Sequence, residues 1–276
     1  MLYKTALFLV LISAAGFVLY LIRQKRIIFR YSFFILFAGF IFHTAFLIYG
    51  FYLLKTAPVI CLSSSLSFFA WCITGVYLLF HIRFGLMVLG SFVAPVAAVL
   101  MIVSSAMPSM ETRVPEMLKS VWLTAHVFFM FAGDGIFVIT LAAAVMYLIQ
   151  ERQIKSKSRG SLYKRLPSLE TLDSINHYTL IYGFSLITVG MITGAIYARY
   201  ALGSYWRWDP KEVWSLVTWI FYAVLLHQRL TVGWRGRRAA LMSVLCFCIL
   251  LFTFLGGSLW LSDYHSFENM GVIKGK

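Results

Sequence analysis

The sequence predicts an all-α integral membrane protein, built as a bundle of about eight transmembrane helices. Of the 276 residues, 61% are hydrophobic and only 12% are charged, which is not the balance of a soluble globular domain. Apolar stretches of about 20 residues, the length that crosses a bilayer as a helix, recur along the chain. Short charged or glycine-containing breaks separate these stretches.

Eight apolar segments are expected to cross the membrane. They lie near residues 5–22, 32–54, 61–80, 84–104, 121–149, 178–199, 213–230 and 240–260. The first begins Met1-Leu2-Tyr3-Lys4 and has no small-residue cleavage site, so we expect a retained helix and not a signal peptide.

The breaks leave little room for a separate globular domain, since the longest one covers only residues 150–177. We therefore expect residues 1–276 to form a single membrane domain. Four N-terminal helices fall in residues 1–104. The second region, 105–276, carries a tryptophan-rich loop at 200–214.

Basic residues give the chain a formal net charge of +14, and their positions decide what this charge means. The breaks at 23–31, 81–83, 150–177 and 229–239 hold 15 of the 24 lysines and arginines. By the positive-inside rule these breaks face the cytoplasm, which places both termini and the tryptophan-rich loop outside. Because the cations lie at helix ends, we expect contact with membrane lipid and none with nucleic acid.

The four cysteines give no sign of redox or haem-attachment chemistry. Cys61, Cys72, Cys246 and Cys248 lie within or beside apolar segments and form no Cys-x-x-Cys pair, so we interpret them as small core residues. The sequence lacks a Cys-x-x-Cys-His motif, and the chain is therefore not itself a c-type cytochrome.

The densest chemical signal is the run Tyr205-Trp206-Arg207-Trp208-Asp209-Pro210-Lys211-Glu212-Val213-Trp214 between two apolar segments. With Trp219 it brings five large aromatic side chains within fifteen residues. Such a surface can stack on a planar conjugated ring, while Arg199, Arg207 or Lys211 pairs with acidic substituents of that ring. Haem fits this description with its apolar macrocycle and two propionates, whereas a quinone fits only the apolar part.

Two interpretations without a ligand stay open for the same run. Asp209 as N-cap, Pro210 at the first helical position and Glu212 at the third describe an ordinary helix start. Tryptophans at a membrane boundary also form belts that anchor helices at headgroup level. The density of indoles around Arg207 favours a ligand platform over a belt alone.

Histidine nitrogen is a common axial ligand of haem iron, and two histidines are expected on the same side as the tryptophans. His126 lies near the outer end of the fifth segment, and His265 lies just beyond the eighth. One from each flank can bind the iron from opposite faces. For either residue the alternative is a polar side chain that is hydrogen-bonded near a helix end.

Three further polar residues fall inside predicted helices. His227 lies ~20 Å below the start of the seventh helix, at a rise of about 1.5 Å per residue, and so in the inner half of the membrane. An ionisable side chain at that depth is a functional candidate by default, and we rank it above His43. Asp134, two turns below His126, either carries a proton, orients a ligand or is a structurally paired acid.

Taken together, these residues resemble the CcsA branch of the cytochrome c assembly family, which has a tryptophan-rich WWD motif. The matching residues are Leu202 through Trp219, His227, Gly233-Trp234-Arg235-Gly236-Arg237-Arg238, Phe252-Thr253-Phe254, His265-Ser266, Trp122-Leu123-Thr124-Ala125-His126 and Tyr147-Leu148-Ile149-Gln150-Glu151. The similarity covers residues 120–268, and the first four helices match only loosely.

The resemblance implies a function in cytochrome c biogenesis. It implies a protein of the bacterial inner (cytoplasmic) membrane that binds haem b and, with a CcsB-type partner, delivers it to the outer face. There the haem is presented to an apocytochrome c for covalent attachment at Cys-x-x-Cys-His. The chain is then a subunit of a cytochrome c synthase complex, although no nucleophile or general base is evident in it.

The resemblance also implies roles for individual residues. The ring contacts are Tyr205, Trp206, Arg207, Trp208, Asp209, Trp214 and Trp219. His126 and His265 correspond to two external histidines that bind the iron. His227 corresponds to a membrane histidine of an inner haem site, whose second ligand is expected from the partner subunit.

Two departures from the family pattern support alternatives. Members often begin the motif with tryptophan, and Ala201-Leu202-Gly203 has none at that point. The chain is also short for the family, which favours the compact HemX relatives that are proposed to influence haem supply or biosynthesis. A haem exporter that never meets an apocytochrome and a quinone-linked oxidoreductase complete the alternatives. The full outer set of histidines and tryptophans favours assembly.

Overall fold

The computed structural model describes residues 1–55, 59, 61–85, 87–107, 118–156 and 164–259. Within these ranges the chain is helical and contains no strand. The described residues form eight α-helices: α1 (Leu2–Arg23), α2 (Arg26–Leu54), α3 (Leu62–Phe84), α4 (Gly90–Ala106), α5 (Val121–Lys155), α6 (Leu169–Leu202), α7 (Pro210–His227) and α8 (Arg237–Leu259). A π-helical turn, η2 (Gln228–Val232), follows α7 directly.

The predicted all-α membrane bundle is confirmed. Six of the described helices, α1, α2, α3, α5, α6 and α8, are long and apolar enough to cross a membrane. Apolar side chains on the outer faces of α1 and α2 are exposed, among them Phe8, Phe34 and Ile48. An exposed apolar surface of this kind is what a protein with lipid as its solvent presents.

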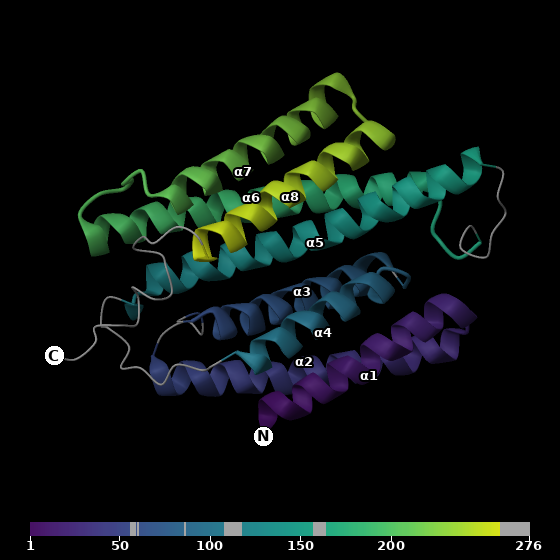
Figure 1. The fold of residues 1–276 in the computed structure, drawn as a ribbon, viewed down its shortest axis with the longest axis horizontal. Helices are drawn as coiled ribbons and strands as arrows, with labels where there is room; N and C mark the ends of the chain where they lie inside the picture. The colour runs from purple at the N-terminus through teal and green to yellow at the C-terminus, as the bar shows by residue number, and fades with distance from the viewer. Residues whose placement is uncertain (56–58, 60, 86, 108–117, 157–163, 260–276) are drawn as a thin grey trace.

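The helices pack in two groups, α1 to α4 and α5 to α8, and α3 of the first group faces α5 of the second (Figure 1). In the first group α1 packs on α2 and α4, and α3 packs on α4. In the second group α5 packs along α6 and α8, while α7 packs on α8 and α6. The contact between α3 and α5 joins the two groups.

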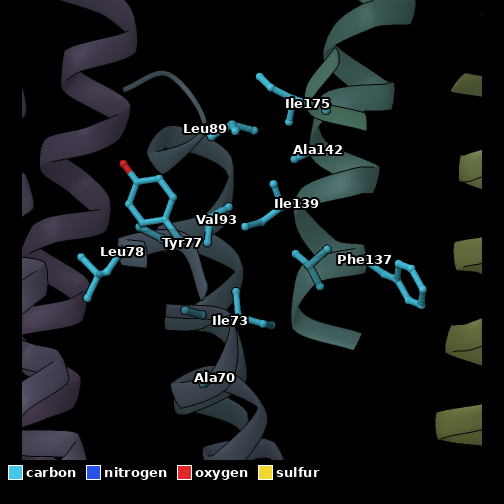
Figure 2. Close-up of a cluster of buried hydrophobic side chains, with 14 of the residues drawn as sticks. Ala70, Ile73, Tyr77, Leu78, Leu89, Val93, Phe137, Ile139, Ala142 and Ile175 are labelled. Atoms are coloured by element: carbon cyan, nitrogen blue, oxygen red, sulfur yellow. The ribbon is translucent and has the colours of Figure 1, made fainter. Parts of the chain in front are cut away.

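A glycine allows α5 to approach α3 closely. A Cβ atom added to Gly135 would lie 3.3 Å from the backbone nitrogen of Ile73. Small residues at such crossings increase van der Waals contact, which drives helix association in a membrane. Figure 2 shows Ile139 of α5 pointing toward Val93 of α4, which lies next to α3, whereas Phe137 points away from these helices.

Two helices continue past the ends that hydropathy predicts. The fifth segment was expected to end at residue 149, but α5 runs to Lys155, and α6 begins nine residues before the expected start at 178. Glutamate, arginine and lysine are good helix formers, and Lys155 pairs with Glu151 one turn earlier at 2.7 Å. Hydropathy marks where a helix leaves the apolar layer and not where the helix stops.

The two ends of the second helix group differ in chemistry. We call one the tryptophan end; it contains the connection 203–209 between α6 and α7 and the first turns of α5. We call the other the basic end; it contains the last turns of α5, the first turns of α6 and the connection 233–236 between η2 and α8. There Arg237 of α8 pairs with Glu151 of α5 at 3.4 Å.

Candidate functional site

The connection from α6 to α7 forms the centre of the tryptophan end. Gly203 ends α6 in a left-handed conformation with φ of 79°, a region that glycine adopts without steric cost. The hydroxyl of Ser204 then donates a 2.8 Å hydrogen bond to the carbonyl oxygen of Trp206. The chain therefore turns sharply after α6, and Trp206 and Trp208 lie in the short connection to α7.

The helix start predicted at Asp209 is present. The Asp209 carboxylate accepts a 2.7 Å hydrogen bond from the backbone N–H of Lys211, and Pro210 is the first residue of α7. Glu212 reaches back to accept the backbone N–H of Arg207 at 2.8 Å. The Asp209 carboxylate caps the first turn of α7, and the Glu212 carboxylate binds the backbone of Arg207. Together they hold the connection on the start of α7.

Trp206 and Trp208 form an edge-to-face pair whose ring centroids lie 6.0 Å apart with an interplanar angle of 84°. Trp208 has a φ of 60°, a conformation that bulky residues rarely adopt, and its side chain is 74% exposed. Strained backbone of this kind clusters at ligand-binding sites. The indole Nε1–H of Trp206 is buried and has no hydrogen-bond partner among the described residues.

Tyr205 extends this aromatic surface and has a cation beside it. Its ring is 61% exposed, and the Arg199 guanidinium lies 5.7 Å from the ring centroid. Arg199 also donates to the carbonyl oxygen of Gly203. The loop thus presents exposed rings, a nearby positive charge and a buried N–H donor, which together match a flat ligand with anionic substituents.

The other two predicted tryptophans face neighbouring helices. The Trp214 ring contacts Phe252 of α8 edge-on at 4.6 Å between centroids and remains partly exposed. Trp219 donates its Nε1–H to Thr188 of α6 at 2.9 Å and packs on Phe184. The structure brings Tyr205, Trp206 and Trp208 together in the loop, whereas Trp219 packs α7 on α6. A ligand contact of Trp214 and Trp219 stays a prediction of the resemblance.

His126 lies in the second turn of α5, and α6 fixes its ring. The Nδ1 atom is 2.7 Å from the carbonyl oxygen of Gly190. A carbonyl oxygen can only accept, so Nδ1 carries a proton, and in the neutral imidazole the lone pair is then on Nε2. Metal-binding histidines are oriented in this way by a hydrogen bond from their other nitrogen.

The same interface is built from glycines that face larger side chains. Across the antiparallel pair of α5 and α6, positions 126, 130, 133 and 137 face positions 194, 190, 187 and 183. A Cβ atom on Gly194 would lie 2.5 Å from His126 Nδ1, and one on Gly190 would lie 2.7 Å from Met130 Sδ. Glycine is therefore required beside the His126 ring.

The remaining predicted polar residues occupy separate places. His227 is the last residue of α7 and is exposed, on the same face as the exposed Ile220 and Val224. His43 is buried between α2 and α3, with its Nε2 atom 2.9 Å from the Ser67 hydroxyl. Asp134 is half-buried on α5. His265 lies outside the described residues.

One group of polar residues was not predicted as a unit. Asp173, Asn176 and Arg229 form a buried hydrogen-bonded cluster at the basic end. The sequence places the first two in a polar break and the third among orientation cations. They meet because α6 runs from Asp173 and Asn176 to the tryptophan end and α7 returns the chain to the basic end, where Arg229 lies.

The described residues contain no cluster of protein side chains that could hold a metal ion by itself. No three histidine, cysteine, aspartate or glutamate side chains converge within the described ranges. An iron porphyrin needs only axial ligands from protein, because the macrocycle supplies the equatorial ones. Fold and site therefore define a multi-pass membrane protein that carries an aromatic, cation-flanked loop and an oriented histidine at the same end of its second helix group.

Comparison with known proteins identifies the family. Residues 59–265 match the family described as "Cytochrome C assembly protein", and the chain belongs to this family. It belongs to the CcsA branch, as the resemblance predicted. The family and these relatives give it a role in cytochrome c biogenesis.

Relatives named "Cytochrome c biogenesis protein CcsA" match 76% of this chain. The protein of Chlamydomonas reinhardtii is 34% identical over 218 residues, which cover 60% of its own length. Those of Mesostigma viride and Gloeobacter violaceus are 32% and 30% identical, with 77% and 78% of their lengths covered.

A solved structure shares the fold. The protein titled "Cytochrome c Heme Lyase CcmF" superposes with a TM-score of 0.61 at 17% sequence identity. The match covers 92% of this chain but 46% of CcmF. This likeness therefore bears on the fold alone.

Proposed function

We propose that the protein binds haem at its tryptophan end and presents it to an apocytochrome c for covalent attachment. The observation that carries this proposal is the fixed tautomer of His126, whose Nδ1–H donates to Gly190 at 2.7 Å. This bond leaves the Nε2 lone pair as the coordinating atom. An axial haem ligand needs that lone pair, and the haem in question is haem b, the non-covalent form that serves as substrate.

The tryptophan-rich loop supplies the remaining contacts in this proposal. Tyr205 and Trp208 offer exposed ring faces for the macrocycle. Arg199, which lies beside the Tyr205 ring, is the proposed partner of a propionate, and the buried Trp206 N–H can donate to a propionate oxygen. Arg207, exposed in the same loop, is proposed as a further cation for these groups. Asp209 and Trp214 hold this loop on α7 and α8.

His265 is the proposed second axial ligand. With His126 it holds the iron from both faces, so that the vinyl groups of the porphyrin point in one direction. The cysteine thiols of the Cys-x-x-Cys-His client then add across the vinyl bonds, with each sulfur bonding one carbon and the thiol proton going to the other. The contribution of this chain is positioning of the ring, and the client supplies the nucleophiles.

An inner haem site at His227, shared with a CcsB-type partner, completes the proposal. His227 lies on an exposed apolar face of α7 that also carries Ile220 and Val224. A polar side chain that faces lipid is costly unless a partner or ligand covers it. A partner helix with a second ligand would satisfy this face.

The proposed location is the bacterial cytoplasmic membrane, with the tryptophan end on the outer side. Support comes from the basic end, where Arg152, Lys155, Arg235, Arg237 and Arg238 gather. By the positive-inside rule that end faces the cytoplasm and contacts anionic lipid headgroups.

The visible spectrum of the detergent-purified protein, coexpressed with its CcsB-type partner, tests this function. The wild type is expected to carry low-spin haem, and His126→Ala and His265→Ala are each expected to lose or shift that signal. Absence of haem in the wild type would overturn the proposal. If haem binds but both variants still mature cytochrome c normally, the protein supplies or exports haem and does not present it.

A further inference from the structure

Arg229 of η2 is buried at the basic end, where it forms a two-pronged ion pair with α6. Its side chain is 3% exposed. Nη1 donates to Asp173 Oδ1 and Nη2 to Asp173 Oδ2, both at 3.1 Å. This geometry uses the planar fork of the guanidinium, which lysine does not have.

Every N–H group of this guanidinium has an acceptor. Besides the two carboxylate bonds, Nη2 donates to the Asp173 carbonyl oxygen at 3.1 Å and Nη1 to Asn176 Oδ1 at 3.1 Å. Nε donates to His177 Nδ1 at 3.4 Å. Because all five donors of the side chain are satisfied by one turn of α6, the position and rotation of Arg229 are fixed together.

The acceptors are themselves tied to other elements. Asp173 Oδ1 also accepts the backbone N–H of Gly236, in the connection to α8, at 2.8 Å. The Asn176 amide donates to the Ser243 hydroxyl of α8 at 3.0 Å and to the Thr140 carbonyl of α5 at 3.3 Å. Arg229 is thus held by a network that spans α5, α6 and α8.

The anchored residue lies directly behind His227. At about 100° of rotation per residue, positions two apart in a helix point to nearly opposite sides. Accordingly Arg229 is buried and His227 is exposed. Fixing the inward face of this turn therefore fixes the direction in which His227 points. The turn is also π-helical, a form that is frequent at functional sites.

We infer that Asp173 and Arg229 are positioning residues that orient His227 as a ligand of the inner haem, an inference that rests on the proposed function of His227. Stability alone is a poor reason for this pair, because buried ion pairs are often no more stable than apolar residues of the same volume. A fully hydrogen-bonded guanidinium instead gives one defined orientation, and that is what an axial ligand on the opposite face requires.

The test uses the full chain with its partner in a His126→Ala background, so that only the inner site holds haem. Asp173→Asn removes the charge and keeps an acceptor for Gly236, while Arg229→Lys keeps the charge and loses the fork. Each is expected to reduce the low-spin haem signal about 10-fold or convert it to high spin, the size of effect that supporting partners have at metal sites. Glu151→Gln, which breaks the exposed pairs with Lys155 and Arg237, is the control and should retain the signal.

Two further measurements separate this inference from the proposed function. If His227→Ala keeps the inner haem signal, the proposed inner site itself is wrong. If His227→Ala loses the signal but Asp173→Asn and Arg229→Lys keep it in full, the inference is overturned and the site stands. With His126 restored, both variants must still carry the outer haem. If the outer haem signal and the amount of protein in the membrane both fall, the pair has only a structural role and the inference is overturned.

Discussion

The Nδ1 atom of His126 on α5 lies 2.7 Å from the carbonyl oxygen of Gly190 on α6. The two helices approach closely here because they cross at glycines. Gly194 lies one turn beyond Gly190 and directly against the imidazole. The orientation of the proposed iron ligand is therefore a property of the helix interface. Substitutions that do not touch the ligand should change it.

Gly194→Ala tests this relationship. The added Cβ atom would lie 2.5 Å from Nδ1 and 2.7 Å from Cε1 of His126, so the ring must move from the position in which it bonds Gly190. We expect loss of the outer low-spin haem signal with normal amounts of protein in the membrane. The control is Gly50→Ala on α2, where a Cβ atom meets nothing within 4 Å. A Gly194→Ala protein with an unchanged spectrum would show that the iron does not depend on His126.

Trp208→Gly separates backbone strain from ligand contact. Trp208 has a φ of 60°, which costs an L-residue roughly 1–2 kcal/mol and glycine almost nothing. We expect Trp208→Gly to unfold at the same or a higher temperature than the wild type and to bind less haem. Trp208→Ala keeps the strain and should lose haem without any gain in stability. Thermal unfolding and haem content, measured together, check both; a Trp208→Gly protein with full haem content would remove this ring from the site.

Much of the fold could be predicted from the sequence, because a transmembrane helix is indicated by a local feature, the length of its apolar segment. The end of α5 and the start of α6 could not, since polar helix formers such as Glu151 and Lys155 continue a helix beyond its apolar segment without any signal in the hydropathy. The tryptophan-rich loop and the cap at Asp209 were equally local and therefore predictable. Their assignment to haem came from resemblance to a family.

The partners of the candidate residues could not be predicted, because they come from other helices. Nothing near His126 in the chain indicates that the carbonyl oxygen of Gly190, 64 residues later, accepts a hydrogen bond from its ring. Likewise Arg229 counted as one cation among many until the structure placed it on Asp173. Hydropathy and motif spacing identify residues and depths, whereas the rotation of each helix about its axis decides contacts.

Trp206→Phe and Trp219→Phe should have opposite effects. The Trp206 N–H is buried without a partner among the described residues, so in the proposed complex it donates to a propionate. Loss of a hydrogen bond to a charged group corresponds to about a 10-fold or larger fall in haem affinity. Trp219 instead bonds Thr188 at 2.9 Å, and its loss should lower the unfolding temperature with haem affinity retained. Haem titration and thermal unfolding of the two variants check this. A Trp206→Phe protein with normal haem affinity, or a Trp219→Phe protein with weakened affinity and normal unfolding temperature, would contradict it.

Asp209 offers the sharpest separation of structure from ligand binding, because two substitutions treat its cap differently. Its carboxylate accepts the Lys211 N–H at 2.7 Å, a bond that asparagine can replace and alanine cannot. We expect Asp209→Asn to keep the haem content of the wild type and to lose less stability than Asp209→Ala, because it keeps the cap and removes only the charge beside Lys211. Asp209→Ala should lose about 1 kcal/mol of stability and, through the displaced loop, part of the haem. The outcome against this view is an Asp209→Asn protein that is fully stable but binds no haem, since the carboxylate charge would then act on the ligand directly and the helix cap would be secondary.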